Sequence, residues 1–121
     1  MFTRDEVIEF CKKFKDVYED YPFHDSNWTV MRCKHNKKTF ALVFEKDECI
    51  WINVKCNPEW IQLWRNTFKS VLPAYHMNKT HWNSIILDGT VPIFDIKRMI
   101  EESYDLVKPK RNYSQPSESQ K

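Results

Sequence analysis

Apolar and polar residues alternate along two neighbouring segments of this chain, and no other feature constrains the fold more strongly. The alternating residues are Phe40, Leu42 and Phe44 in the first segment and Ile50, Ile52 and Val54 in the second. A period of two is typical of β-strands that bury one face. Residues 46–48 predict a hairpin turn between the two segments, and the β-forming segment 28–33 precedes them across a basic turn at 34–38. The sequence therefore predicts three successive antiparallel strands.

A helix is expected before these strands. Thr3 and Glu6 stand three residues apart in the pattern of a capping box, which satisfies free backbone N–H groups at a helix start. Apolar residues then recur at three- and four-residue steps as far as Tyr18. This spacing predicts one helix with a single buried stripe, which ends before Pro22.

Two more helices and two more strands follow. Asn57-Pro58-Glu59 has the composition of a helix start, and the apolar spacing after it predicts a helix that continues to Pro73. Segments 74–77 and 82–87 are expected to be strands. Pro92 begins a last helix with its own apolar stripe.

The predicted order is thus helix, three strands, helix, two strands, helix. Each helix has one apolar stripe, so an α+β fold of two layers is expected, with one antiparallel sheet and the helices mainly on one face. The predicted core includes Phe10, Phe14, Phe40, Leu42, Ile52, Trp64, Phe68 and Ile100. Strand alternation places Trp51 and Lys55 on the opposite, uncovered face. A functional site is expected there.

Charge is distributed unevenly along the chain. The chain carries +2 overall, and four Lys or Arg residues against one Glu in segment 108–121 account for +3, which leaves −1 for residues 1–107. Within that body, residues 26–87 carry +5, whereas residues 1–25 and 88–107 carry −3 each. This asymmetry favours an anionic partner or, alternatively, acidic helices that flank a Lys-bearing sheet.

Composition also predicts the domain organisation. Residues 1–107 contain all of the periodic segments and are expected to form a single domain. Segment 108–121 is rich in Pro, Ser, Gln and Lys and has little apolar surface to bury. It is therefore expected to be a disordered basic C-terminal tail.

Several classes of function lack support in the sequence. Gly89 is the single glycine, which leaves no glycine-rich phosphate loop, and no serine lies in a nucleophile elbow. The cysteine and histidine spacing matches no zinc pattern. We expect no catalytic residues, no cofactor and no metal. No apolar run approaches the ~20 residues that span a bilayer. The N-terminus is acidic, unlike a signal peptide, so a cytoplasmic location without a membrane partner is expected.

Basic and aromatic residues supply the candidate site. Cationic side chains neutralise phosphates, aromatic rings stack on bases, and Asn and His hydrogen-bond to base edges or sugar hydroxyls. The predicted nucleic-acid-binding residues are Arg32, Lys37, Lys38, Lys55, His76, Asn78, Lys79 and Trp82. The turns that contain Lys37 and Lys79 are expected to project from the sheet rim as wings. Two alternatives stay open: Trp82 in the core, and Arg32 paired with an acid on a neighbouring helix.

Five segments in order along the chain resemble the MmcQ/YjbR-like family. They are W-T-V-M-R at 28–32, N-K-K-T-F-A at 36–41, Lys55 followed by Asn57-Pro58, Y-H-M-N-K-T-H-W-N at 75–83 and S-Y-D-L-V at 103–107. The resemblance covers about residues 3–107, and the segment H-M-N-K-x-H-W is its most specific part.

This resemblance implies the same order of helices and strands, in a fold related to the frataxin-like (CyaY-like) and secretion-chaperone-like arrangements. The family is commonly labelled DNA-binding on account of a proposed winged surface, and it has no assigned reaction. We therefore expect a small non-enzymatic DNA-binding module that uses basic wings and the uncovered sheet face. The alternative is a protein-interaction or chaperone-like adaptor that uses the same face.

Overall fold

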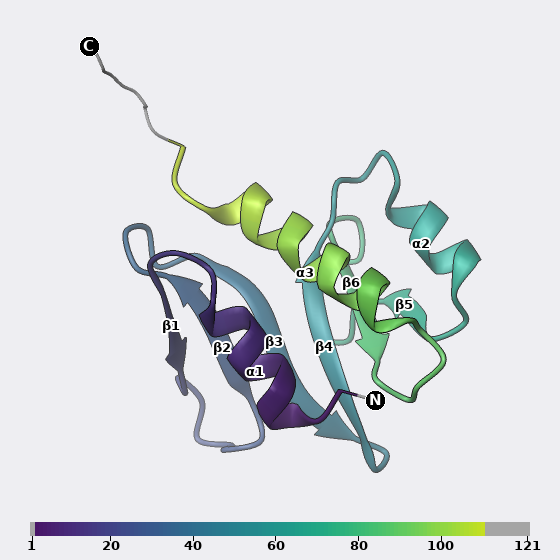
Figure 1. Ribbon diagram of the computed structural model, residues 1–121, viewed down its shortest axis with the longest axis horizontal. Coiled ribbons are helices and arrows are strands. Elements are labelled where there is room, and N and C mark those ends of the chain that lie inside the picture. The colour runs from purple at the N-terminus through teal and green to yellow at the C-terminus, as the bar shows by residue number, and fades with distance from the viewer. Residues whose placement is uncertain (1, 111–121) are drawn as a thin grey trace.

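The computed structural model describes residues 2–110, and these form one sheet with three helices (Figure 1). The elements in chain order are α1 (Arg4–Lys12), β1 (Val17–Asp20), β2 (Thr29–Cys33), β3 (Thr39–Lys46), β4 (Cys49–Lys55), α2 (Ile61–Thr67), β5 (Val71–Pro73), β6 (Trp82–Ile86) and α3 (Ile93–Val107). Most of the predicted basic tail, residues 111–121, lies outside the described residues.

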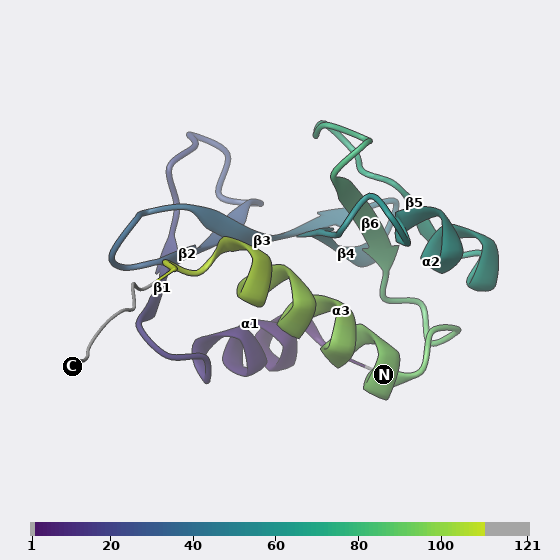
Figure 2. The same cartoon turned by 90° about the horizontal axis from the view of Figure 1, so that it is seen from above.

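The six strands form one antiparallel sheet in the order β1-β2-β3-β4-β6-β5. Figure 2 shows α1 and α3 against one side of this sheet, while α2 lies beyond its β5 edge. Trp64 of α2 and Phe68, the residue that follows α2, pack against the same core as α1 and α3. The predicted α+β fold, with helices mainly on one face of an antiparallel sheet, is confirmed.

The first helix is shorter than predicted. Its capping box is present, because the Thr3 hydroxyl accepts from the Glu6 N–H at 3.1 Å and the Glu6 carboxylate accepts from the Thr3 N–H at 2.9 Å. The helix nevertheless ends at Lys12, and Asp16 adopts a left-handed φ of 57° that turns the chain. Residues Val17–Asp20 then form β1 beside β2, so four strands precede α2 instead of three.

A β-bulge changes the predicted alternation in β3. Ala41 pairs with Met31 and Thr39 pairs with Arg32, so Phe40 is an extra residue on β3. Phe40 consequently faces the helices, where its ring contacts Phe14 and Tyr104. Leu42 and Phe44 face the other side of the sheet. The prediction that Phe40, Leu42 and Phe44 share one face was wrong, because a bulge is not visible in an apolar pattern.

The segment around α2 also differs from its prediction. Residues 57–60 form a turn in which the Asn57 side chain accepts from the Glu59 N–H at 2.9 Å, and α2 begins only at Ile61. After α2, the strand is Val71–Pro73, earlier than the predicted segment 74–77. Pro73 can take part because β5 is an edge strand, where a missing N–H costs little.

The predicted core residues are buried or pack against the core. Phe40, Leu42, Ile52 and Ile100 are buried, and Phe10, Phe14, Trp64 and Phe68 are partly buried against the core cluster. Burial raises the pKa of the Cys11 thiol to about 12, so this cysteine acts as a small apolar residue. Between residues 2 and 110, no three His, Cys, Asp or Glu side chains gather into a cluster that could hold a metal ion. No helix in that range is long and apolar enough to span a membrane.

Candidate functional site

The sheet face opposite the helices holds the predicted site. Alternation along β4 sends Ile52 and Val54 into the helix-side core and leaves Trp51, Asn53 and Lys55 on the other face, as predicted. Two loops rise on this side of the sheet, one between β1 and β2 and one between β5 and β6 (Figure 2). We call this surface the open face.

Five of the eight predicted residues line one hollow at the end of the open face. This basic hollow has a volume of about 310 Å³ and is lined by Arg32, Lys37, Lys38, Thr39, Lys55, Trp82, Leu106 and Val107. The lining residues come from β2, the β2–β3 turn, β3, β4, β6 and the end of α3. Residues far apart in the sequence therefore line one hollow.

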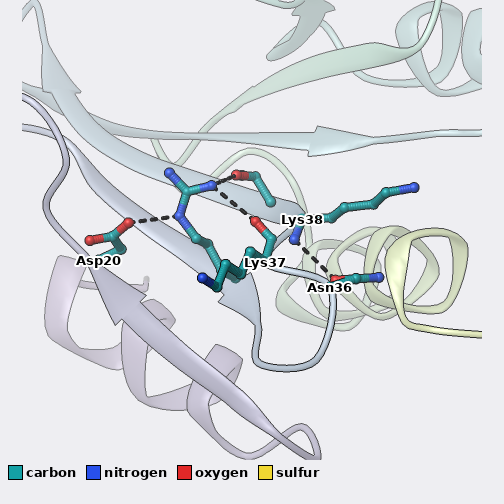
Figure 3. A network of polar contacts seen from close by, with 6 residues as sticks. Asp20, Asn36, Lys37 and Lys38 are labelled. Carbon is teal, nitrogen blue, oxygen red and sulfur yellow. Dashed lines mark hydrogen bonds and ion pairs between the residues drawn. The ribbon is translucent and has the colours of Figure 1, made fainter.

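Arg32 is held in place by three acceptors. Its Nε donates to Asp20 Oδ2 at 2.7 Å, and its Nη1 donates to the Lys37 carbonyl and to Thr39 Oγ1, both at 3.1 Å (Figure 3). The acid partner was foreseen as an alternative, but it lies on the neighbouring strand β1 instead of on a helix. Arg32 thus both contributes charge to the hollow and fixes the start of β3.

The β2–β3 turn presents its lysines to solvent. Lys37 has a left-handed φ of 61°, and the Asn36 side chain accepts from the Lys38 N–H at 3.0 Å. Asn36 Nδ2 also donates to the Val107 carbonyl at 2.9 Å, which ties the turn to the end of α3. Lys37 and Lys38 are exposed, and neither forms an ion pair with any described residue. Their charges are therefore available to a ligand.

Lys55 and Trp82 form the inner wall of the basic hollow. They are direct partners across β4 and β6, and both are half-buried. The Lys55 N–H donates to Ser103 Oγ at 2.8 Å, and the Ser103 hydroxyl donates to the Phe40 carbonyl at 2.6 Å. These bonds fasten the end of β4 to α3. Trp82 is thus a partly exposed ring opposite Lys55 and is not fully buried in the core.

Asn78 and Lys79 lie near this wall but do not line the hollow. They belong to the β5–β6 loop, where Asn78 Oδ1 accepts from the Thr80 N–H at 2.8 Å. Arg65 of α2 donates to the Lys79 carbonyl and, at 2.6 Å, to Asn83 Oδ1. Sequence reasoning missed Arg65, since an arginine that binds a distant backbone carbonyl leaves no pattern in the sequence.

His76 lies in a second hollow of the open face. This aromatic hollow has a volume of about 260 Å³ and is lined by Phe23, Asp25, Trp28, Leu42, His76 and Met77. His76 has a left-handed φ of 62°, and its ring lies 4.0 Å from the Tyr75 ring, centroid to centroid. The predicted single site is therefore divided: five residues line the basic hollow, His76 lines the aromatic hollow, and Asn78 and Lys79 line neither.

An aromatic cluster supports the second hollow. Trp28 stacks on Phe44 with centroids 4.1 Å apart, and Phe44 lies 5.8 Å from Tyr75. The Lys46 ammonium lies 5.1 Å from the Trp51 ring centroid and 5.2 Å from that of Tyr75. Sequence reasoning missed Trp28 and Phe44 as site residues because their types also fit a core, and the bulge in β3 hid the face that Phe44 occupies.

A hollow larger than these two lies elsewhere. It measures about 820 Å³, sits between α2 and α3, and contains none of the predicted residues. Glu101, Glu102 and Asp105 border it, against the single cation Arg98. Three carboxylates would repel phosphate, so this groove does not suit a nucleic acid.

Comparisons with known proteins agree with this architecture. Residues 12–106 match the family model YjbR. An uncharacterised protein of Bacillus subtilis named YyaQ is 35% identical over 119 residues, which cover 89% of this chain and 100% of that protein. Escherichia coli YjbR, also described as uncharacterised, is 30% identical over 84% of each chain. The chain therefore belongs to the YjbR family, as the resemblance in its sequence predicted.

Two solved structures share the fold. A crystal structure of a Deinococcus radiodurans protein has a TM-score of 0.79 and 32% identity, and the match covers 88% of this chain and 79% of that one. A crystal structure of a Pseudomonas syringae protein has a TM-score of 0.78 and 29% identity, with 88% and 99% covered. These likenesses extend over nearly the whole described chain.

Proposed function

We propose that this protein is a non-enzymatic DNA-binding module whose basic hollow contacts the phosphate backbone. The observation that carries the proposal is the convergence of Arg32, Lys37, Lys38 and Lys55 around Trp82. Within the described chain, Arg32 alone among these four cations has a carboxylate partner. A group of unpaired cations around one ring favours a ligand that offers negative charge and a flat surface.

The distribution of charge between the two layers supports the same partner. Helices α1 and α3 carry most of the acids from the two negative ends of the sequence, and they cover the sheet face opposite the open face; only the last residues of α3, Leu106 and Val107, border the basic hollow. Much of the negative charge of the nearly neutral body therefore lies on the helix side of the sheet. Such a charge distribution orients the open face toward a polyanion. A DNA partner also agrees with the cytoplasmic location expected from the sequence.

The direct test is the triple mutant Lys37→Ala/Lys38→Ala/Lys55→Ala. We expect weaker binding to a fluorescent 20-base-pair duplex of any sequence, because the lost contacts are to phosphates. Three lost contacts should also make the slope of log K against log salt shallower by about 2 to 3. Fluorescence anisotropy at several salt concentrations measures both quantities.

A matched control removes the same charge from other surfaces. Lys13, Lys15 and Lys69 are exposed and lie outside the basic hollow, so Lys13→Ala/Lys15→Ala/Lys69→Ala should keep most of the affinity and the salt slope. Circular dichroism verifies that both mutants are folded. Equal affinity of the two triple mutants for DNA would refute the assignment of the basic hollow.

A second candidate is a protein-interaction adaptor on the same face. Exposed rings favour it, because Tyr21 and Phe23 are 54% and 52% exposed beside the open face. Apolar rings contribute to protein interfaces with little salt dependence, whereas phosphate contacts weaken steeply as salt rises. A stoichiometric complex with a protein partner that survives high salt, together with no DNA binding at low salt, would favour the adaptor.

A further inference from the structure

We propose that the aromatic hollow binds one unpaired nucleobase of a single-stranded DNA whose phosphates lie in the basic hollow. This inference rests on the proposed DNA-binding function and adds the type of strand and the part of the ligand that is recognised. Both hollows are bordered by β3, since Thr39 lines the basic hollow and Leu42 lines the aromatic one, with the bulge at Phe40 between them. Three residues along a strand span about 10 Å, a distance that a short stretch of single strand can bridge.

The walls of the aromatic hollow suit a flat, apolar ring. Phe23 and Trp28 meet edge to face with centroids 6.4 Å apart, and the stack of Trp28 on Phe44 keeps the Trp28 ring in place. Leu42 and Met77 complete the apolar lining. Phe23 remains 52% exposed, so a base that enters the hollow would cover apolar surface that the protein itself leaves in water. Stacking on aromatic rings is the usual way in which proteins hold unpaired bases.

The polar groups of this hollow suit the edge of a base and disfavour a phosphate. One Asp25 carboxylate oxygen accepts from the Asn27 N–H at 2.9 Å, and Asp25 makes no ion pair with any residue from 2 to 110. Its other oxygen can accept a hydrogen bond from an exocyclic amine such as cytosine N4. A carboxylate repels phosphate, so the phosphates belong in the basic hollow and the base in the aromatic hollow.

The loop that carries His76 is built to hold a fixed shape beside this base. The Tyr75 N–H donates to Ser84 Oγ at 2.9 Å, and Asn53 Nδ2 donates to the Tyr75 carbonyl at 2.9 Å. The next residue, His76, adopts a left-handed φ of 62° that few non-glycine residues accept. Such backbone conformations gather at ligand sites, where the surrounding structure maintains them.

The test compares three single strands of twelve nucleotides at low salt: oligo-dC, oligo-dT and a strand of abasic sites. The abasic strand keeps the phosphates and lacks bases, so it measures the basic hollow alone. For the wild-type protein we expect the affinity to fall from oligo-dC to oligo-dT to the abasic strand, with oligo-dC bound roughly fivefold more tightly than oligo-dT. Phe23→Ala should weaken oligo-dC roughly fivefold or more and leave the abasic strand unchanged.

Two variants complete the design. Asp25→Asn keeps the oxygen that accepts from Asn27 and removes the charge, so it should reduce the preference for oligo-dC over oligo-dT. Phe94→Ala, which removes a 69% exposed ring on α3, is the matched control and should leave the affinities for all three strands unchanged. If all three strands bind equally and Phe23→Ala has no effect, the base site is wrong and the basic hollow stands. If no single strand binds at low salt, the base site is wrong, and the duplex experiment with the lysine triple mutants decides separately whether the basic hollow binds phosphates.

Discussion

The two faces of the sheet bury their residues in different ways. On the helix side, the strands contribute mainly aliphatic residues such as Val43, Ile52 and Ile85, all fully buried beneath α1 and α3. On the open side, the strands and loops contribute aromatic residues such as Trp28, which retains exposed surface. Arg32 and Lys55 extend the open face toward the sheet end.

This difference indicates separate roles for the two faces. Aliphatic side chains sealed under helices contribute stability through burial and have no surface left for a ligand. Rings and cations that stay partly exposed bury less area, and they keep surface that a partner can cover. Substitutions on the helix side should therefore change folding most, and substitutions on the open side should change binding most.

The largest effect is expected from Phe40→Ala. Phe40 is fully buried and contacts the rings of Phe14 and Tyr104, so its removal leaves a cavity between the sheet, α3 and the turn that follows α1. We expect the free energy of unfolding to fall by about 3–5 kcal/mol. Urea denaturation measures this change. A loss below about 1 kcal/mol would contradict the structure of the bulge that turns Phe40 toward the helices.

Trp28→Ala should cost less, although the residue removed is larger. The substitution removes the stacking contact between Trp28 and Phe44. Trp28 is only half-buried, however, so part of its ring already contacts water in the folded protein. If the effect scales with buried area, the free energy of unfolding should fall by roughly 2 kcal/mol in the same urea experiment. A loss equal to that of Phe40→Ala would mean that the open face is a second core, and the contrast between the two faces would disappear.

Some of this contrast was predictable from the sequence. The capping box at Thr3 and the alternation around Trp51 depend on local rules, and the structure confirms both. Val17 fits either a helical stripe or a strand, and the left-handed Asp16 that decides between them depends on the pairing of β1 with β2. Likewise, the bulge at Phe40 depends on register with the neighbouring strand, which a single segment does not encode.

The candidate site also contains residues whose positions follow local rules and residues whose positions depend on long-range contacts. Lys37 and Lys55 were predictable, because a turn and an alternating strand have known directions. The positions of His76 and Lys79 were not, since the β5–β6 loop is shaped by distant partners such as Arg65. A loop that takes its conformation from long-range contacts cannot be placed from its own residues.

A smaller effect is expected from Asp20→Asn. This change removes the carboxylate charge that Arg32 Nε contacts at 2.7 Å, and both side chains are partly exposed. We expect a loss of at most about 1 kcal/mol in unfolding free energy, since solvent screens such pairs. DNA affinity should rise slightly, because one negative charge leaves the border of the basic hollow. A fall in affinity would show that Asp20 matters chiefly by orienting Arg32.

The smallest effect concerns Glu19, which fastens β1 to the helix layer. Its carboxylate accepts from the Tyr21 hydroxyl and lies 3.2 Å from Lys12 Nζ of α1. The Tyr21 hydrogen bond, followed by the Lys12 contact, lowers the pKa of Glu19 despite partial desolvation. A lowered folded-state pKa stabilises the fold above the unfolded-state pKa, and this contribution is lost as pH falls through the folded-state pKa.

Glu19→Gln should therefore be less stable than wild type at pH 7 by roughly 0.5 kcal/mol, because the contact is partly solvated. The deficit should shrink as pH is lowered from about 5 toward 3, where the wild-type carboxylate is progressively protonated and loses the same contribution. Urea denaturation at pH 7 and pH 3 measures the difference, and Glu59→Gln, at an exposed position before α2, is the matched control. A deficit that grew on acidification would reverse the sign of the linkage. Glu19 would then have a raised pKa in the folded protein, and its contacts with Tyr21 and Lys12 could not be what fastens β1 to the helix layer.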